Sequence, residues 1–150
     1  NACAMIKEKN ILFLCTGNSC RSQMAEGFAR TIFPKNWNIH SAGTVAIGVH
    51  PLSIEVMKEI GIDISKQYSK TIDDIPIEKI DIVITLCGNA KDRCPVFPRK
   101  VLQEHWPIDD PISLSGTKEL MTAFRRIRDD IHSRIKQLAK TLFTSQSVNR

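Results

Sequence analysis

The feature that most restricts the fold of this chain is a run of large apolar residues, residues 11–14 (ILFL), followed directly by a polar loop, residues 15–22 (CTGNSCRS). Four consecutive large apolar residues between polar ones are typical of a buried strand. The segment after the loop is typical of an amphipathic helix, because its apolar residues recur at helical spacing: Met24, Ala25, Phe28, Ala29 and Ile32. The sequence therefore predicts Cys15 at the carboxyl end of a strand and Arg21 at the start of a helix.

The loop has the spacing Cys-x5-Arg and the composition of an oxyanion-binding site. Backbone N–H groups of such a loop can turn inward, and the helix N-terminus adds about half a positive charge. The guanidinium of Arg21 suits a tetrahedral anion, and the same positive field favours the thiolate of Cys15 over the thiol. The alternative is a buried structural cysteine followed by an ordinary first-turn arginine. We favour a nucleophilic Cys15 with an oxyanion cradle formed by Thr16, Gly17, Asn18, Ser19, Cys20, Arg21 and Ser22.

Strands and helices alternate along the rest of the chain. We expect strands at residues 37–41, 80–86 and 101–106, and helices at residues 51–60 and 120–142. Gly61 is expected to end the helix that Pro51 opens. This order predicts an α/β fold, a three-layer sandwich in which helices flank a central parallel four-stranded sheet. Ligands of such sheets bind beyond the carboxyl ends of the strands, where Cys15 is expected to lie.

Length and charge narrow the function classes. The 150 residues predict a single domain, residues 1–150, in which we expect residues 1–4 to be partly an extension ahead of Met5 and residues 144–150 to fray. No apolar run approaches the ~18 residues of a membrane span, so we expect a cytoplasmic protein with no membrane contact. We also expect the protein to be a monomer. The net charge of +5 is scattered among acidic residues, which disfavours nucleic acid binding.

Two further cysteines, Cys87 and Cys94, lie close together in the sequence. In a cytosolic protein, clustered cysteines indicate metal or redox chemistry rather than a disulfide framework. Across a helical segment their Cα atoms would be about 10 Å apart, whereas a disulfide requires roughly 4.4–6.8 Å. Gly88, Asn89 and Pro95 make this segment a poor helix, so it can bend to close the bond. We favour a redox pair over two unrelated buried thiols, and the spacing is a poor match to a zinc site.

A reaction at a bound oxyanion needs a proton donor for the departing oxygen. Asp109 and Asp110 precede Pro111 in a loop from which a carboxyl group can reach a site, although such pairs are also common turn residues. The spacing alone does not distinguish the two acids. Cys20 is expected to be a packing residue. The four histidines have no motif around them and are expected to be structural or exposed: His40, His50, His105 and His132.

Residues 15–27 (CTGNSCRSQMAEG) resemble the low-molecular-weight protein tyrosine phosphatase superfamily. More narrowly, the chain is similar to the thioredoxin-coupled arsenate reductase branch of that superfamily. The narrower resemblance rests on further stretches: residues 38–43, residues 83–87 with Cys94-Pro95, and residues 104–106 ahead of residues 109–111. It extends from about Ile11 to the final helix.

The resemblance implies a three-cysteine relay. Cys15 attacks arsenate held by the loop and Arg21, while Asp110 protonates the departing hydroxide. Cys87 then attacks the Cys15–arsenic adduct, which releases arsenite and leaves a Cys15–Cys87 disulfide. Cys94 displaces Cys15, and the resulting Cys87–Cys94 disulfide is reduced by thioredoxin. The resemblance implies no bound cofactor or metal, and external thioredoxin is the reductant.

Two positions depart from the superfamily pattern. Some relatives bind a monovalent cation through residues matching Asn18, Glu26 and Ser41 plus a later acid, whose place is held here by Lys70. An ammonium group in that place predicts no requirement for potassium. Phosphatases of the superfamily usually carry tyrosines after the Asp-Pro, whereas this chain has Ile112 and no aromatic wall. Two alternatives to an arsenate reductase are a phosphatase acting on phosphomonoesters and a non-enzymatic regulator that binds oxyanions or metals.

Overall fold

A computed structural model describes residues 9–86, 96–113 and 117–144 of the chain. The predicted relay residues Cys87 and Cys94 lie outside these ranges, as do both chain ends. The strands are β1 (Lys9–Cys15), β2 (Trp37–Gly43), β3 (Ile82–Thr85) and β4 (Leu102–His105). The α-helices are α2 (Arg21–Ile32), α3 (Pro51–Glu59) and α5 (Thr117–Ala139). Shorter helical turns are η1 (Ile72–Asp74), η2 (Ile77–Lys79), η3 (Pro111–Ser113) and a π-helical turn, η4 (Lys140–Thr144).

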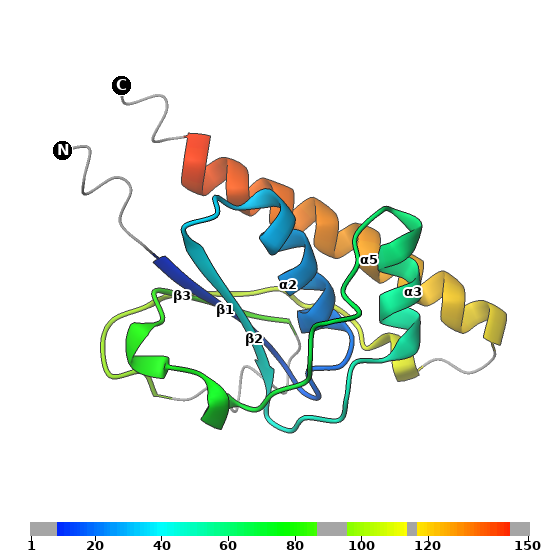
Figure 1. Cartoon of the computed structure of the whole chain (residues 1–150), viewed down its shortest axis with the longest axis horizontal. Coiled ribbons are helices and arrows are strands. Elements are labelled where there is room, and N and C mark those ends of the chain that lie inside the picture. Colours follow the sequence, from blue (N-terminus) through cyan, green and yellow to red (C-terminus); the bar gives the residue numbers. More distant parts are fainter. Residues whose placement is uncertain (1–8, 87–95, 114–116, 145–150) are drawn as a thin grey trace.

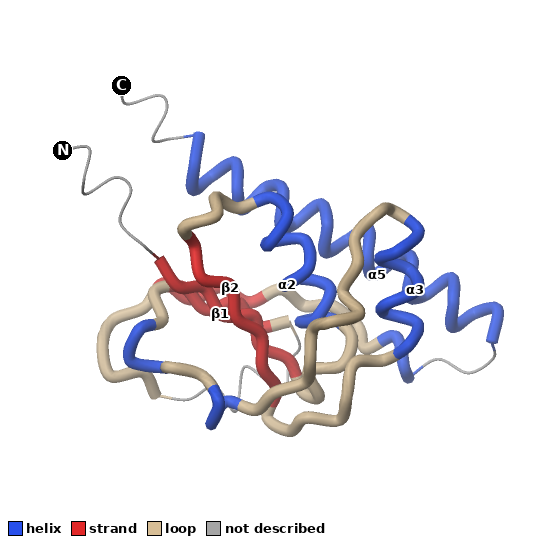
Figure 2. The backbone as a smooth tube through the Cα atoms, in the orientation of Figure 1, coloured by secondary structure: helices blue, strands red, loops and turns tan. Residues whose placement is uncertain are grey.

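The four strands, drawn in red in Figure 2, form one parallel sheet in the order β2-β1-β3-β4. This confirms the predicted α/β architecture. The predicted strand over residues 80–86 is shorter in the structure, which assigns Ile82–Thr85 to β3. Asp81 directly precedes it, and its carboxylate accepts a hydrogen bond from the Asn10 N–H at 2.8 Å. Parallel register places Cys15 opposite Gly43, so the carboxyl ends of β1 and β2 meet beside the polar loop.

The core lies around the two central strands and the helices that cover them. The four apolar residues of β1, residues 11–14, are fully buried, whereas the edge strand β4 is mostly exposed. Helices α2, α3 and α5 contact one another and lie side by side in Figure 1. Helix α2 is buried from Arg21 to Ala29, while α5 buries a single apolar stripe of Phe124, Ile127, Ile131, Ile135 and Leu138. The burial of α5 therefore follows the helical spacing read from the sequence, whereas α2, predicted to be amphipathic, is buried on every side over Arg21 to Ala29.

Helix α3 begins and ends as its sequence predicts. Pro51 occupies the first turn, and the His50 ring accepts a hydrogen bond from the Leu52 N–H at 3.0 Å. At the other end Gly61 has φ +83°, and its N–H and that of Ile62 bond back to carbonyls of the last turn. The chain then reverses toward the polar loop.

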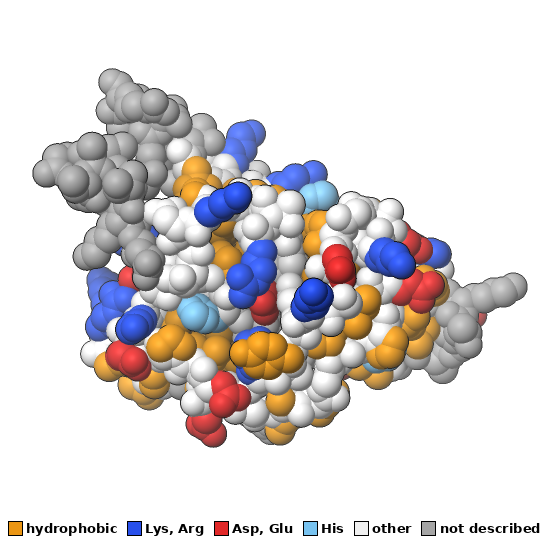
Figure 3. Space-filling view, in the orientation of Figure 1, with side chains coloured by type: hydrophobic (Ala, Val, Ile, Leu, Met, Phe, Trp, Pro, Cys, Tyr) orange, Lys and Arg blue, Asp and Glu red, His pale blue; other side chains and the backbone are white. Residues whose placement is uncertain are grey.

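Charged side chains are dispersed over the face seen in Figure 3, where Lys and Arg alternate with Asp and Glu. This agrees with the scattered charge expected from the sequence. In the described part of the chain, every helix is too short or too polar to cross a membrane.

Candidate active site

The strand–loop–helix unit places Cys15 and Arg21 around one small pocket. Cys15 is the last residue of β1, Arg21 is the first of α2, and both are buried. The pocket has a volume of about 110 Å³ and is lined by loop residues, by Asp110 and by three aliphatic side chains, Val45, Ile47 and Ile112. These three side chains are 41–64% exposed and form an apolar rim around a polar floor.

The loop carbonyls all point away from this pocket. Each of four consecutive carbonyls lies 2.8–3.2 Å from two donor groups elsewhere in the chain. The donors are Thr44 and Val45 to Thr16, Ile47 to Gly17, Gln23 to Asn18, and His50 and Ser53 to Ser19, while the single hydroxyl hydrogen of Ser69 is shared between the Gly17 and Asn18 carbonyls. In a planar trans peptide the N–H points opposite to the C=O, so carbonyls held outward turn the N–H groups of residues 17–20 inward. The loop is thereby preorganised to bind an anion.

Asn18 and Ser22 link the loop to the sulfur of Cys15. Asn18 has a left-handed backbone (φ +49°), a conformation that asparagine tolerates better than most residues. Its Nδ2 donates to Ser22 Oγ at 2.8 Å, and Ser22 Oγ lies 2.8 Å from Cys15 Sγ. A hydroxyl at this distance can donate to a thiolate and stabilise its charge.

Arg21 connects the anion cradle to the predicted acid. Its Nη1 donates to the Ile108 carbonyl at 3.0 Å, and its Nη2 lies 3.7 Å from Asp110 Oδ2. Both acids line a neighbouring cavity of about 360 Å³ against α5, but only Asp110 also lines the pocket of Cys15. The structure thus separates two acids that the sequence could not distinguish.

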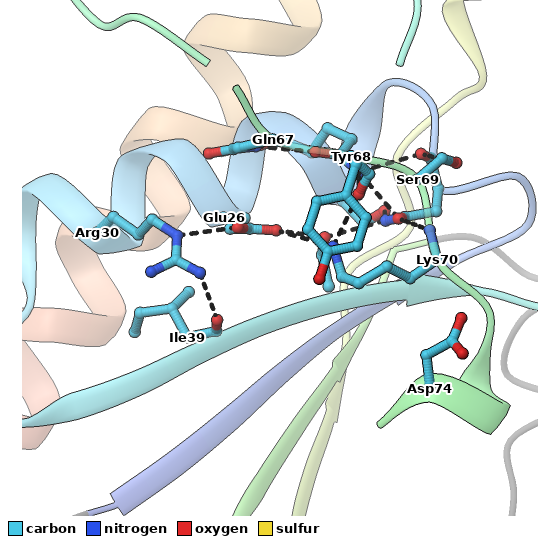
Figure 4. A network of polar contacts seen from close by, with 12 residues as sticks. Glu26, Arg30, Ile39, Gln67, Tyr68, Ser69, Lys70 and Asp74 are labelled. Carbon is cyan, nitrogen blue, oxygen red and sulfur yellow. Dashed lines mark hydrogen bonds and ion pairs between the residues drawn. The ribbon is translucent and has the colours of Figure 1, made fainter. Parts of the chain in front are cut away.

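A partly buried ion pair lies behind the loop (Figure 4). Lys70 Nζ lies 3.7 Å from Glu26 Oε1 and donates to the Tyr68 carbonyl at 2.8 Å. Ser41 Oγ donates to the same Glu26 oxygen at 2.5 Å and accepts from Asn18 Nδ2 at 3.0 Å. Burial lowers the pKa of Lys70, although Glu26 opposes this shift. The chain thus supplies a positive charge of its own beside the loop, and independence from potassium stays a prediction.

Cys20 differs from Cys15 in its surroundings. Burial raises the pKa of the Cys20 thiol to about 11, even though the hydroxyls of Ser53 and Ser19 oppose this. A thiol with so high a pKa is a poor nucleophile at neutral pH. The side chain of Cys20 therefore suits the packing role expected from the sequence.

The histidines have structural partners outside the Cys15 pocket. His40 Nε2 lies 3.0 Å from Asn10 Oδ1, and His105 Nδ1 lies 2.7 Å from the Thr85 hydroxyl. His132 stacks on Phe28, with ring centroids 4.3 Å apart. In the ranges that the structure describes, no three His, Cys, Asp or Glu side chains are grouped to hold a metal ion.

Sequence reasoning missed most of the residues that support the loop. Ser69 and Gln23 donate to loop carbonyls, and Val45 and Ile47 form much of the rim. The only signal for the rim was an apolar alternation directly after the second strand. Ser69 had no signal, because its role depends on a contact more than fifty residues away in the sequence.

Comparison with known proteins places the chain in a family. The model of the low molecular weight phosphotyrosine protein phosphatase family matches residues 10–148. An arsenate reductase of Bacillus licheniformis is 51% identical over 137 residues, which cover 91% of this chain and 99% of that protein.

Solved structures agree with this assignment. One, described as an arsenate reductase in the phosphate binding state, superposes with a TM-score of 0.72 at 36% identity, over 89% of this chain and 98% of that one. A thioredoxin-dependent arsenate reductase of Corynebacterium glutamicum superposes with a TM-score of 0.74 at 28% identity, over 91% of this chain and 63% of that one. With Cys15 and Arg21 framing an anion cradle at the head of β1, this chain belongs to the low molecular weight phosphotyrosine protein phosphatase family.

Proposed function

We propose that this protein is an arsenate reductase that uses Cys15 as its nucleophile. The observation that carries the proposal is the loop whose four carbonyls are all held outward, which leaves a ring of N–H donors around the Cys15 sulfur. The close similarity to curated arsenate reductases selects arsenate among tetrahedral oxyanions.

In the first step the Cys15 thiolate attacks the arsenic atom of bound arsenate. A sulfur–arsenic bond forms as one arsenic–oxygen bond breaks, and the oxygen takes a proton from Asp110 and leaves as water. The loop N–H groups and Arg21 stabilise the negative charge on the remaining oxygens. The contact between Arg21 and Asp110 keeps the acid at the mouth of the same pocket.

The reduction then requires two more thiols, and we assign them to Cys87 and Cys94. Cys87 attacks the Cys15 sulfur, and the electron pair of the sulfur–arsenic bond passes to arsenic, so As(V) becomes As(III) while two thiols become one disulfide. Cys94 next displaces Cys15 and forms a Cys87–Cys94 disulfide. A dithiol reductant, thioredoxin, returns this pair to thiols. The thioredoxin dependence named for the Corynebacterium glutamicum relative supports that choice.

The size and rim of the pocket favour a bare oxyanion over an aryl phosphate. A volume of about 110 Å³ accommodates a tetrahedral anion, and Ile112 offers no aromatic ring to stack on a phenyl group. Phosphatase activity on phosphomonoesters is the alternative, because the family takes its name from that reaction. We expect it to be the weaker activity. We further propose that the protein acts as a monomer in the cytoplasm without a bound cofactor.

The test is arsenate-dependent NADPH oxidation in the presence of thioredoxin and thioredoxin reductase. We expect turnover by the wild type and its loss in three single variants: Cys15→Ser, Cys87→Ser and Cys94→Ser. Aryl phosphate hydrolysis that only Cys15→Ser abolishes, together with no arsenate turnover, would instead establish the phosphatase. Metal retained through purification without turnover of either substrate would point to a binding regulator.

A further inference from the structure

We propose that Gln23 is a positioning residue, which fixes the direction of the hydrogen bonds that end on the Cys15 thiolate. The inference rests on the proposed function only in taking Cys15 as the nucleophile. Gln23 is the third residue of helix α2 and directly follows Ser22; it is fully buried and is not a lining residue of the Cys15 pocket. Its effect on the sulfur therefore passes through other side chains.

Backbone groups determine the orientation of the Asn18 amide. The backbone N–H of Lys70, which can only donate, lies 2.7 Å from one atom of this amide, which must therefore be the oxygen. The amide nitrogen then faces Ser22 Oγ at 2.8 Å and Ser41 Oγ at 3.0 Å. Because an amide NH₂ group only donates, both hydroxyl oxygens accept from Asn18.

The orientation of Asn18 in turn directs the hydroxyl of Ser22. Since Ser22 Oγ accepts from Asn18, its hydrogen remains available for Cys15 Sγ, which is 2.8 Å away. A hydrogen bond donated to a thiolate stabilises the charged form of the sulfur. Ser41 completes a parallel branch, in which its hydroxyl donates to Glu26.

Gln23 holds Asn18 in this orientation from the other side. Its Nε2 lies 2.8 Å from Asn18 Oδ1, 3.0 Å from the Tyr68 carbonyl and 3.2 Å from the Asn18 carbonyl, and its two hydrogens are directed mainly at the two nearer acceptors. A carbonyl only accepts, so the nitrogen of Gln23 must face it. Gln67 Nε2 donates to Gln23 Oε1 at 2.8 Å and to the Gln23 carbonyl at 3.0 Å, which locks the Gln23 amide in turn. Figure 4 shows Gln67 and Tyr68 on the segment that lies against α2.

The result is a hydrogen-bond chain with one direction throughout, which runs from Gln67 through Gln23, Asn18 and Ser22 to Cys15. Without the Gln23 donor, Asn18 Oδ1 keeps the Lys70 N–H, and the amide is held in this orientation by one hydrogen bond fewer. The hydrogen bond from Asn18 that aims the Ser22 hydroxyl at the sulfur is then less firmly positioned, and the thiolate is less stabilised.

The test measures the rate of Cys15 alkylation by iodoacetamide against pH, with the modified peptide identified by mass spectrometry. We expect Gln23→Met to raise the midpoint of the profile by about half to one pH unit, a part of what a hydrogen bond to a charged group contributes. Below the midpoint the rate then falls about three- to tenfold. Gln67 is half-buried and begins the hydrogen-bond chain, and Gln67→Met should give a smaller shift in the same direction. Gln137→Met, on the exposed face of α5, is the matched control and should give none.

A double variant separates action through Ser22 from a general loosening of the site. Among the residues that the structure describes, the other ionisable groups around the pocket are Arg21, Asp110 and Cys20, with Glu26 and Lys70 behind it, and all are retained in these variants. If Gln23 acts through Ser22, adding Gln23→Met to Ser22→Ala produces no further shift. Unchanged profiles for both glutamine variants, or shifts that add in full to that of Ser22→Ala, would overturn the proposal.

The alkylation profile does not depend on arsenate turnover. A wild type that fails to reduce arsenate but shows the predicted shifts would refute the proposed function and leave this inference intact. Normal arsenate reduction, together with alkylation profiles of the variants that coincide with that of the wild type, would refute this inference and leave the proposed function intact.

Discussion

Replacing Gly43 by alanine should damage the active site although the residue touches no substrate. Gly43 ends β2 opposite Cys15, and a Cβ atom built on it would meet three backbone atoms of the surrounding turns. The nearest is the Val45 carbonyl oxygen, followed by the Thr16 carbonyl oxygen at 2.6 Å and the Asn18 nitrogen at 2.7 Å. All three belong to the loop or to the segment whose N–H groups hold it.

The size of the effect follows from these distances. To reach even 3.0 Å, below which real Cβ contacts essentially never occur, the Thr16 oxygen must retreat by 0.4 Å and the Asn18 nitrogen by 0.3 Å. Because these are backbone atoms, no side-chain rotation can relieve the clash. Overpacking of this kind costs about 1–3 kcal/mol, and we expect the upper end. Since a ~1 Å misplacement of reacting groups costs about 100-fold in rate, a loop shift of this size should lower kcat/KM for arsenate by about four- to sixfold.

The assay pairs arsenate turnover with urea unfolding and includes Gly61→Ala as the control. Gly61 has φ +83° but no atom within 4 Å of a Cβ placed there, so alanine meets backbone strain without a clash. We expect Gly61→Ala to lose about 1 kcal/mol of stability and to retain wild-type activity. If Gly43→Ala matched Gly61→Ala in both arsenate turnover and urea unfolding, the close approach of Gly43 to the loop would not matter for activity, and the reasoning would be refuted.

Three further predictions concern the acid, the lysine and the histidines. Asp110→Asn should slow formation of the Cys15–arsenic adduct by about 100-fold or more in single-turnover measurements. Thioredoxin should still reduce the oxidised variant at the wild-type rate. Equal slowing of both steps would contradict the assignment of Asp110 as the acid. Because Lys70 pairs with Glu26, arsenate turnover should be the same in potassium and sodium chloride at equal ionic strength, and a potassium-specific stimulation would refute this. Burial, aided by Arg30, lowers the pKa of His40, and burial, aided by Lys136, lowers that of His132. The unfolded chain thus binds protons first on acidification, so the free energy of unfolding should fall as pH drops below about 6.5, and His132→Phe should flatten this dependence in urea titrations at several pH values.

The parts of the molecule that the sequence predicted are those encoded by short-range patterns. The apolar run of residues 11–14 identified the central strand, because a strand buried on both faces has little room for polar side chains. Pro51 and Gly61 marked the ends of α3 through their own backbone preferences. The Cys-x5-Arg spacing placed Cys15 and Arg21 at one loop for the same reason, since both lie within one strand–turn–helix unit.

The remaining features depend on which distant segments the sheet brings together. Apart from Gln23, the donors that hold the loop carbonyls outward come from residues 44–53 and from Ser69, and no local spacing connects these segments with the loop. Asp109 and Asp110 are chemically equivalent in the sequence. Only the packing of their loop against Arg21 directs the side chain of Asp110 toward the Cys15 pocket. The register of β1 against β2 brings Gly43 against the loop, because hydrogen-bond pairing between strands is set by the whole sheet rather than by either strand alone.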